Sequence, residues 1–396
     1  MSDFIGTKLT MNLGERSYDI IVKSGSLENL YQFARLDRRV AVVTDSGVPA
    51  QYAQMVADQC KDAHIITVPQ GEASKSFKIL ESVLRQSFAD FELLLVDDGS
   101  TDGSAALAHE LAKKDGRIRV LEQPNAGICA ARNLGLQHCR GQWFTFCDDD
   151  DTMLPHALET LLVLAKSTGA DVVRGGYRLL RANAAGTAVE LPHPPGQAII
   201  IHKPAGQGYL QFLQQSGPQF VWNAMYCTNR LGHLRFDETC RKGLEDFAFN
   251  AAVFQQADSA AYTPQIVYEH LERQGSTSAC GNPAAVQVRL RWVQAEYTAA
   301  RAWCPPQQLP KVWGARQAEF VTFVIHQLRD GRLPPKAKAA AWRSLQQALA
   351  ACPHSRLDFW YALRHNKKQG AALFLFRTHL QGLYACLPNR EEKLLQ

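Results

Sequence analysis

Acidic residues directly follow two apolar runs that are typical of strands, and carboxylates so close together can bind metal ions. Asp97 and Asp98 end the apolar run LLLVDD, and the four residues Asp148 to Asp151 follow the run WFTFC. Adjacent carboxylates raise one another's pKa or require a cation. A hard divalent ion such as Mg²⁺ or Mn²⁺, held by one or two carboxylates and by phosphate oxygens, is the simplest cation. The two runs therefore predict a metal site that binds a diphosphate.

A third acidic pair, Glu245 and Asp246, precedes the apolar helical pattern FAFNAAVF. Asp246 is a candidate general base that accepts a proton from an attacking hydroxyl while a sugar carbon gains oxocarbenium character. We expect its position near a helix start to keep its pKa low and the carboxylate ionised. The alternative is that the pair serves only the first turn of a helix.

The segment QPNAGICAARNLGL lies between the first two acidic runs. Asn125 and Gly127 end a strand and begin a helix, and a helix N-terminus favours anions. Arg132 offers a planar fork of donors to a phosphate, although a salt bridge is the commoner use of such a residue. For the first run the alternative is also structural, with Asp98 or Ser100 as the N-cap of the helix that follows.

The elements that must position these side chains alternate between short apolar strands and helical patterns. We expect strands at 38–45, 64–69, 91–100, 117–123 and 142–147, and helices at 48–60, 76–86 and 125–139. The runs ELLLV and WFTF suit strands buried on both faces, so the prediction is an α/β fold with a mostly parallel sheet. Ligands bind beyond the carboxyl ends of such strands, so both acidic runs should face one crevice.

The composition limits the class of protein. The chain has 396 residues, 46% of them hydrophobic, and a formal net charge of +5. This mild charge suits an anionic substrate or a membrane surface and does not indicate nucleic acid. Ten scattered cysteines indicate reduced thiols, and the N-terminus shows no apolar h-region. We expect a cytoplasmic protein, at most peripheral to the inner face of the membrane.

Beyond about residue 280 the sequence becomes helical, and segment 363–387 mixes cationic with bulky apolar residues. Two interpretations are open. The segment is a terminal helix packed on the body, or it presents an amphipathic surface that contacts an anionic membrane.

The motifs VDDGSTDGS, NAGICAARNLG, CDDDD and GLEDF occur in this order between residues 65 and 280. Together they resemble family 2 glycosyltransferases of the GT-A fold. The resemblance implies a metal-dependent, inverting hexosyltransferase that moves a sugar from a nucleotide-diphosphate donor, expected to be a UDP-sugar, to a hydroxyl of a glycan or glycolipid. The implied setting is the synthesis of bacterial surface polysaccharide or lipooligosaccharide.

The resemblance also assigns roles to residues of this sequence. Asp97, Asp98, Arg132 and Asp148 are the implied donor-binding residues, with Arg132 near the uridine or diphosphate. Asp148 and Asp150 are the implied ligands of Mn²⁺ or Mg²⁺, and Asp246 is the implied base.

Residues 1–81 instead resemble the beginning of 3-dehydroquinate synthase, and this resemblance implies that Glu72 and Lys75 contact NAD. The metal ligands of that family have no counterpart here, so an NAD-binding lyase is an incomplete alternative. A third alternative is an inactive fusion of the two families. We expect domains at 1–64, 65–280 and 281–396, with the strand at 64–69 completing the transferase sheet.

Overall fold

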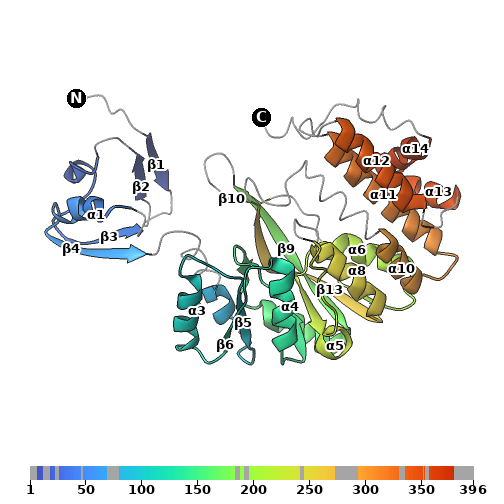
Figure 1. Ribbon diagram of the computed structural model, residues 1–396, viewed down its shortest axis with the longest axis horizontal. Coiled ribbons are helices and arrows are strands. Elements are labelled where there is room, and N and C mark those ends of the chain that lie inside the picture. Colours follow the sequence, from blue (N-terminus) through green and yellow to red (C-terminus); the bar gives the residue numbers. More distant parts are fainter. Residues whose placement is uncertain are drawn as a thin grey trace. The chain divides into compact units, whose positions relative to one another are not determined.

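The computed structural model divides the chain into two compact units, Met1–Lys78 and Ile79–Gln396 (Figure 1). The structure describes residues 7–11, 18–22, 26–45, 48–68, 80–182, 188–190, 196–240, 245–272, 293–329, 335–350, 352 and 356–378. Glu72 and Lys75, and the predicted boundary at 280/281, lie outside these ranges.

The N-terminal unit contains two small sheets. Strands β1 (Thr7–Met11) and β2 (Tyr18–Val22) pair antiparallel. Strands β3 (Arg39–Asp45) and β4 (Asp62–Val68) pair parallel over seven residues and are connected by helix α1 (Ala50–Ala57). A short 3-10 helix, η2 (Leu30–Gln32), precedes β3.

Strand β4 contains the residues that the sequence assigns to the edge of the transferase sheet, and within its own unit it pairs with β3. β4 pairs with β3 along its whole length, so the predicted boundary at 64/65 falls inside a strand. The two compact units divide at 78/79 instead. The physical reason is that β3 and β4 are both short β-branched runs, which pair as a parallel unit within their own segment.

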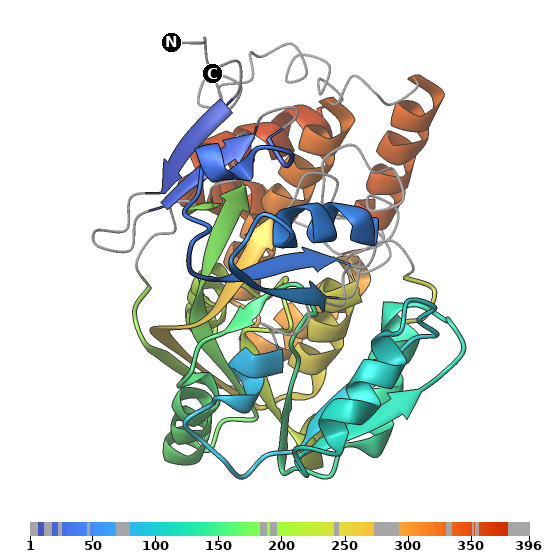
Figure 2. The same ribbon diagram turned by 90° about the vertical axis from the view of Figure 1, so that its left-hand side faces the viewer.

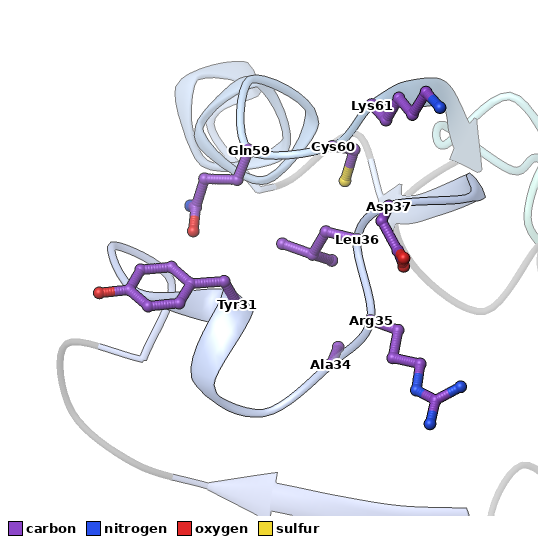
Figure 3. Close-up of a pocket in the computed structure, with 8 residues that line it drawn as sticks. All are labelled: Tyr31, Ala34, Arg35, Leu36, Asp37, Gln59, Cys60 and Lys61. Carbon is purple, nitrogen blue, oxygen red and sulfur yellow. The ribbon is translucent and has the colours of Figure 1, made fainter.

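A pocket of about 680 Å³ lies in the N-terminal unit (Figure 3). It is lined by Tyr31, Ala34, Arg35, Leu36, Asp37, Gln59, Cys60 and Lys61. None of the predicted site residues is among them.

The second unit begins with a helical turn over residues 80–84, followed by a two-stranded parallel sheet. This sheet consists of β5 (Leu93–Asp97) and β6 (Ile118–Glu122), connected by helix α3 (Ser104–Ala112). Among the described residues β5 pairs with β6 and with no other strand.

The larger sheet has seven strands in the described part of this unit, with the order β11-β13-β9-β12-β7. β10 pairs with β9, and β8 pairs with β13. The strands are β7 (Trp143–Thr145), β8 (Thr152–Met153), β9 (Val172–Ala182), β10 (Ala188–Glu190), β11 (Ile199–His202), β12 (Ala224–Cys227) and β13 (Ser259–Glu272). β9 and β13 are parallel and the other pairs are antiparallel, so the sheet is mixed rather than mostly parallel.

Helices cover both faces of the larger sheet. Successive residues of a strand point to opposite faces, and each face packs against a different group of helices. Val172 of β9 lies in one apolar cluster with residues of α4, α6, α8 and α10, and Val173 lies in another with residues of α5. These helices are α4 (Ile128–His138), α5 (Ala157–Thr168), α6 (Gln207–Ser216), α8 (Glu245–Gln256) and α10 (Val293–Trp303). A short helix, α7 (Thr228–Leu231), follows β12.

The C-terminal region is helical, as the composition predicts. Its further helices are α11 (Leu309–Arg329), α12 (Pro335–Ala350), α13 (Arg356–His365) and α14 (Lys367–Arg377). Figures 1 and 2 both show α11 to α14 in orange and red at one end of the second unit, away from α3 and β6. Among the described residues, no helix has the length and the apolar character needed to cross a membrane.

Candidate active site

Arg132 of α4 is the centre of the candidate site. Its side chain is only 9% exposed and lies against three carboxylates. Nη2 is 2.7 Å from Oδ1 of Asp148, and Nη1 is 2.5 Å from Oδ1 of Asp246 and 3.3 Å from Oε1 of Glu245. The site therefore joins the end of β7 to the first turn of α8 through one guanidinium.

The surroundings of Arg132 are apolar on one side. The rings of Phe146 and Phe236 have their centroids 5.8 and 5.2 Å from its guanidinium carbon. Burial in such a place lowers the pKa of an arginine, but the charges of Asp246, Asp148 and Glu245 outweigh it and raise the pKa. One cation thus faces three carboxylates, and the cluster has a surplus of negative charge when all of them are ionised.

The pKa of Asp246 differs from the low pKa that its position near a helix start predicts. Burial raises the pKa of its carboxyl to about 7, and the charges of Asp148 and Glu245 act in the same direction. Arg132 and the backbone N–H of Val221, which donates to Oδ2 over 3.1 Å, oppose this rise. The expectation of a low pKa is wrong, because burial next to other carboxylates outweighs the position at a helix start.

Glu245 completes this part of the cluster. Its Oε1 faces Arg132, while its Oε2 is buried and has no hydrogen-bond partner in the part of the chain that the structure describes. A buried acceptor without a donor is costly, so this atom is a place where a ligand or ion could add a bond.

Basic side chains of the protein contact two of the four carboxylates in the run Asp148 to Asp151. Asp148 faces Arg132, and the buried Asp151 lies with both its oxygens 2.9 Å from Nδ1 of His270 on β13. Burial lowers the pKa of His270, but its hydrogen bond with Asp151 and the charge of Asp151 raise it more. Asp149 is exposed and Asp150 is half-buried. Arg132, and His270 when it is protonated, therefore supply part of the positive charge that the sequence assigns to a metal alone.

Asp98 holds the loop that leads into α4. Its oxygens accept hydrogen bonds from Nε2 of Gln123 and from the backbone N–H groups of Ala126 and Gly127, at 2.6 to 2.9 Å. Burial raises the pKa of Asp98, but these three bonds lower it more. Helix α3 starts at Ser104 with no side-chain cap, so neither Asp98 nor Ser100 is its N-cap.

Asp97 accepts a hydrogen bond from the backbone N–H of Ser100, which tightens the turn after β5. Asp98 and Arg132 both lie near the start of α4, because Arg132 follows Gly127 by five residues, or roughly 7.5 Å along the helix at about 1.5 Å per residue. The structure thus brings the three acidic segments to the region of one helix, α4. Their roles toward a donor stay predictions.

The residues present fit a divalent cation only in company with another oxygen donor. Among the described residues, no three His, Cys, Asp or Glu side chains are arranged to hold a metal by themselves. Mg²⁺ is commonly held by one or two carboxylates together with substrate phosphates. Asp148 and Asp150 can supply such carboxylates, and a diphosphate would supply the remaining oxygens.

Several residues at the site carry no motif in the sequence. The phenol oxygen of Tyr268 accepts a hydrogen bond from the backbone N–H of Asp148, and its ring stacks on Trp222. Tyr268 and His270 lie two residues apart on β13 and so share one face of the strand. This alternation is the only sequence signal that could have identified them.

A buried clamp fixes the backbone that contacts Asp246. Arg174 of β9 is fully buried and donates to the carbonyl oxygens of Ser216, Gly217 and Phe220. Asn250, one turn after Asp246 on α8, donates to the carbonyl oxygens of Pro218 and Phe220 over 2.8 Å. The clamp holds the segment that ends with the N–H of Val221.

The chain is similar to known glycosyltransferases in sequence and in fold. The family model described as Glycosyl transferase family 2 matches residues 78–185. This segment of the chain is therefore similar to family 2 glycosyltransferases. Its matched segment includes the predicted donor and metal residues Asp97, Asp98, Arg132, Asp148 and Asp150.

Bacterial proteins are among the relatives that this chain resembles in sequence. The uncharacterized glycosyltransferase EpsJ of Bacillus subtilis is 29% identical over 215 residues, which cover 54% of this chain and 61% of EpsJ. The succinoglycan biosynthesis protein ExoO of Rhizobium meliloti is 27% identical over 321 residues, or 74% of this chain and 86% of ExoO. The chain thus spans less than two thirds of the length of EpsJ.

The fold is that of GT-A glycosyltransferases. TarS of S. aureus, in its structure of residues 1–349 in complex with UDP-GlcNAc, matches with a TM-score of 0.59 at 17% identity. The match covers 88% of this chain and 90% of TarS 1–349. The predicted α/β GT-A fold is confirmed. The resemblance of residues 1–81 to 3-dehydroquinate synthase is unsupported by these matches and stays a prediction.

Proposed function

We propose that the chain transfers a sugar from a UDP-sugar to a hydroxyl of a glycan or glycolipid, with inversion at the sugar carbon and with a divalent cation. The observation that carries this proposal is the meeting of Asp148 and Asp246 on the guanidinium of Arg132. The contact supports the proposal because it joins the proposed base to the proposed phosphate and metal site, and Arg132 and Asp148 lie in the segment that matches the glycosyltransferase family model.

In the proposed reaction Asp246 takes the proton of the acceptor hydroxyl. The hydroxyl oxygen then forms a bond to the anomeric carbon, the bond from that carbon to the diphosphate oxygen breaks, and the diphosphate leaves with the electron pair. A pKa of about 7 suits a base that works near neutral pH. Each oxygen of Asp246 already accepts one hydrogen bond, and each has a second lone pair for the incoming proton.

Charge on the departing diphosphate must be offset. A divalent cation held by Asp148 and Asp150 would supply this charge stabilisation. Arg132 can contribute only by a change of partners, because both of its terminal nitrogens already face carboxylates. A diphosphate that competes with Asp148 or Asp246 for Arg132 would thus couple donor binding to the state of the base.

The synthesis of a bacterial surface polysaccharide is the proposed setting, and the similarity to ExoO supports it. A donor screen tests the function: UDP release is measured across nucleotide sugars with and without Mn²⁺, and the anomeric configuration of the product is read by NMR. Metal-dependent release with an inverted product supports the proposal, and a retained configuration contradicts it.

A binding protein without turnover is the second candidate. The observation that favours it is that β5, which ends at the predicted donor residue Asp97, pairs only with β6 among the described strands. Calorimetric titration with UDP in the presence of Mn²⁺ distinguishes the two: binding without release from any donor supports the second candidate. The same titration with NAD tests the lyase alternative.

A further inference from the structure

Helices α13 and α14 form an antiparallel hairpin around Asn366. The rings of Phe359 and Phe374, which lie about equally far from Asn366 in the sequence, have centroids 5.5 Å apart. A Cβ atom on Gly370 would come within 2.4 Å of the Cα of Leu363, so the two helices approach closely at this glycine. The hairpin is therefore a tightly packed unit with defined inner and outer faces.

The inner face of α14 packs on the body of the protein. Its buried residues are Gly370, Ala372, Leu373 and Phe376. The ring of Phe376 stacks on Trp342 of α12, with centroids 5.7 Å apart. Helix α14 thus packs on the body, as one of the two interpretations of segment 363–387 has it, whereas residues 379–387 lie outside the described residues.

The outer face presents large aromatic rings to solvent. Trp360 of α13 is 56% exposed, and Phe374 of α14 is 46% exposed. Phe359 contacts both rings, so the two exposed side chains belong to one aromatic patch. Exposed Trp and Phe in one patch mark a surface that contacts an apolar or interfacial partner.

The turn of the hairpin is cationic. Arg364, Lys367 and Lys368 are exposed, and the sequence from 359 to 378 contains no Asp or Glu. The neighbouring Asp358 is buried. Lysines in the first turn of a helix oppose the helix dipole, so these two residues do not serve the stability of α14.

We propose that this outer face, defined by Trp360, Arg364, Lys367, Lys368 and Phe374, binds the surface of a bilayer that contains anionic phospholipids. The aromatic rings would enter the interface while the cations meet the lipid phosphates. Charge complementarity favours this partner over a second copy of the chain, because two copies of the face would bring like charges together.

Vesicle co-sedimentation of the full chain tests the proposal without any donor or acceptor. We expect binding to phosphatidylcholine vesicles that contain phosphatidylglycerol, and weaker binding as salt rises. The double variant Lys367→Glu/Lys368→Glu should lower the partition coefficient by about tenfold or more. The matched control is Lys113→Glu/Lys114→Glu, which changes two adjacent exposed lysines after α3 and should bind like the wild type.

The aromatic half of the face has its own pair of variants. Trp360→Ser should weaken binding to the same vesicles, whereas Val163→Ser, at a 61% exposed position of α5, should not. Circular dichroism of each variant confirms that the helices are retained. Absence of binding by the wild type, equal binding to vesicles of phosphatidylcholine alone, or equal losses in the control variants would overturn the proposal. Self-association that Trp360→Ser abolishes, without vesicle binding, would assign the face to a second copy instead.

Discussion

Arg132 donates a 2.5 Å hydrogen bond from Nη1 to Oδ1 of Asp246, and this ion pair joins α4 to the first turn of α8. Both side chains are largely buried, so neither charge is well solvated without the other. The stability of the site and the proposed chemistry of the base therefore depend on the same contact.

The first prediction concerns stability. Arg132→Met should lower the free energy of unfolding by about 3 kcal/mol or more at pH 8, because it leaves buried carboxylates without their cation. Urea unfolding measures the change. The double variant Arg132→Met/Asp246→Asn should lose less than the sum of the two single variants, since the second change removes one of the unpaired charges. Strict additivity would show that the two residues do not interact.

The second prediction concerns pH. The raised pKa of Asp246 means that its carboxyl is protonated below about 7 and cannot accept a proton there. The rate of sugar transfer at saturating substrate should therefore rise with pH through about 7 and then level off. A flat profile between pH 5 and pH 8 would contradict this.

The same pKa has a consequence for folding. A carboxyl whose pKa is raised in the folded state, from an ordinary 3.8 to about 7, stabilises the fold at low pH. This stabilisation is fully present below the ordinary value and is lost as the pH rises through about 7. Thermal unfolding of Asp246→Asn should show less of this loss than the wild type.

The third prediction concerns the divalent cation. Removal of Mn²⁺ with a chelator should weaken the binding of UDP, as measured by isothermal titration. Asp150→Ala should remove the metal-dependent part of the affinity and abolish turnover. Asp149→Ala is the matched control, because Asp149 is an exposed neighbour in the same run and should keep both properties. Equal effects of the two substitutions would contradict the assignment of the metal to Asp150.

The fourth prediction concerns the buried clamp. Asn250→Leu removes two donors to the backbone of the segment before Val221 and leaves Arg174 with one acceptor fewer. We expect a loss of about 2 kcal/mol in the free energy of unfolding. The rate of transfer should fall while the KM for the donor stays near its original value. Gln256→Ala, at the exposed end of α8, should change neither quantity.

The sequence predicts those helices and strands whose residues form an apolar run or a helical pattern. Strands β5, β6 and β7 coincide with apolar runs, and α4 coincides with a helical pattern. The motifs predicted that Asp98, Asp148 and Asp246 belong to one site, and the structure brings all three to α4. The roles of these residues in binding and catalysis stay predictions.

Other features depend on contacts between distant segments and have no local signal. His270 meets Asp151 across 119 residues, and no motif links them. The pKa of Asp246 depends on burial and on neighbouring charges, which a position at a helix start does not reveal. The partner of β4 could not be predicted either, since a β-branched run of this length fits the edge of either sheet.

The base assignment is tested most directly by the rate of UDP release from the preferred donor in the wild type and in Asp246→Asn. Glu110→Gln, an exposed carboxylate of α3, is the control. We expect Asp246→Asn to slow release by about 10² to 10⁴-fold, while UDP still binds and Glu110→Gln retains the wild-type rate. Release at the same rate by the wild type and by Asp246→Asn would contradict it.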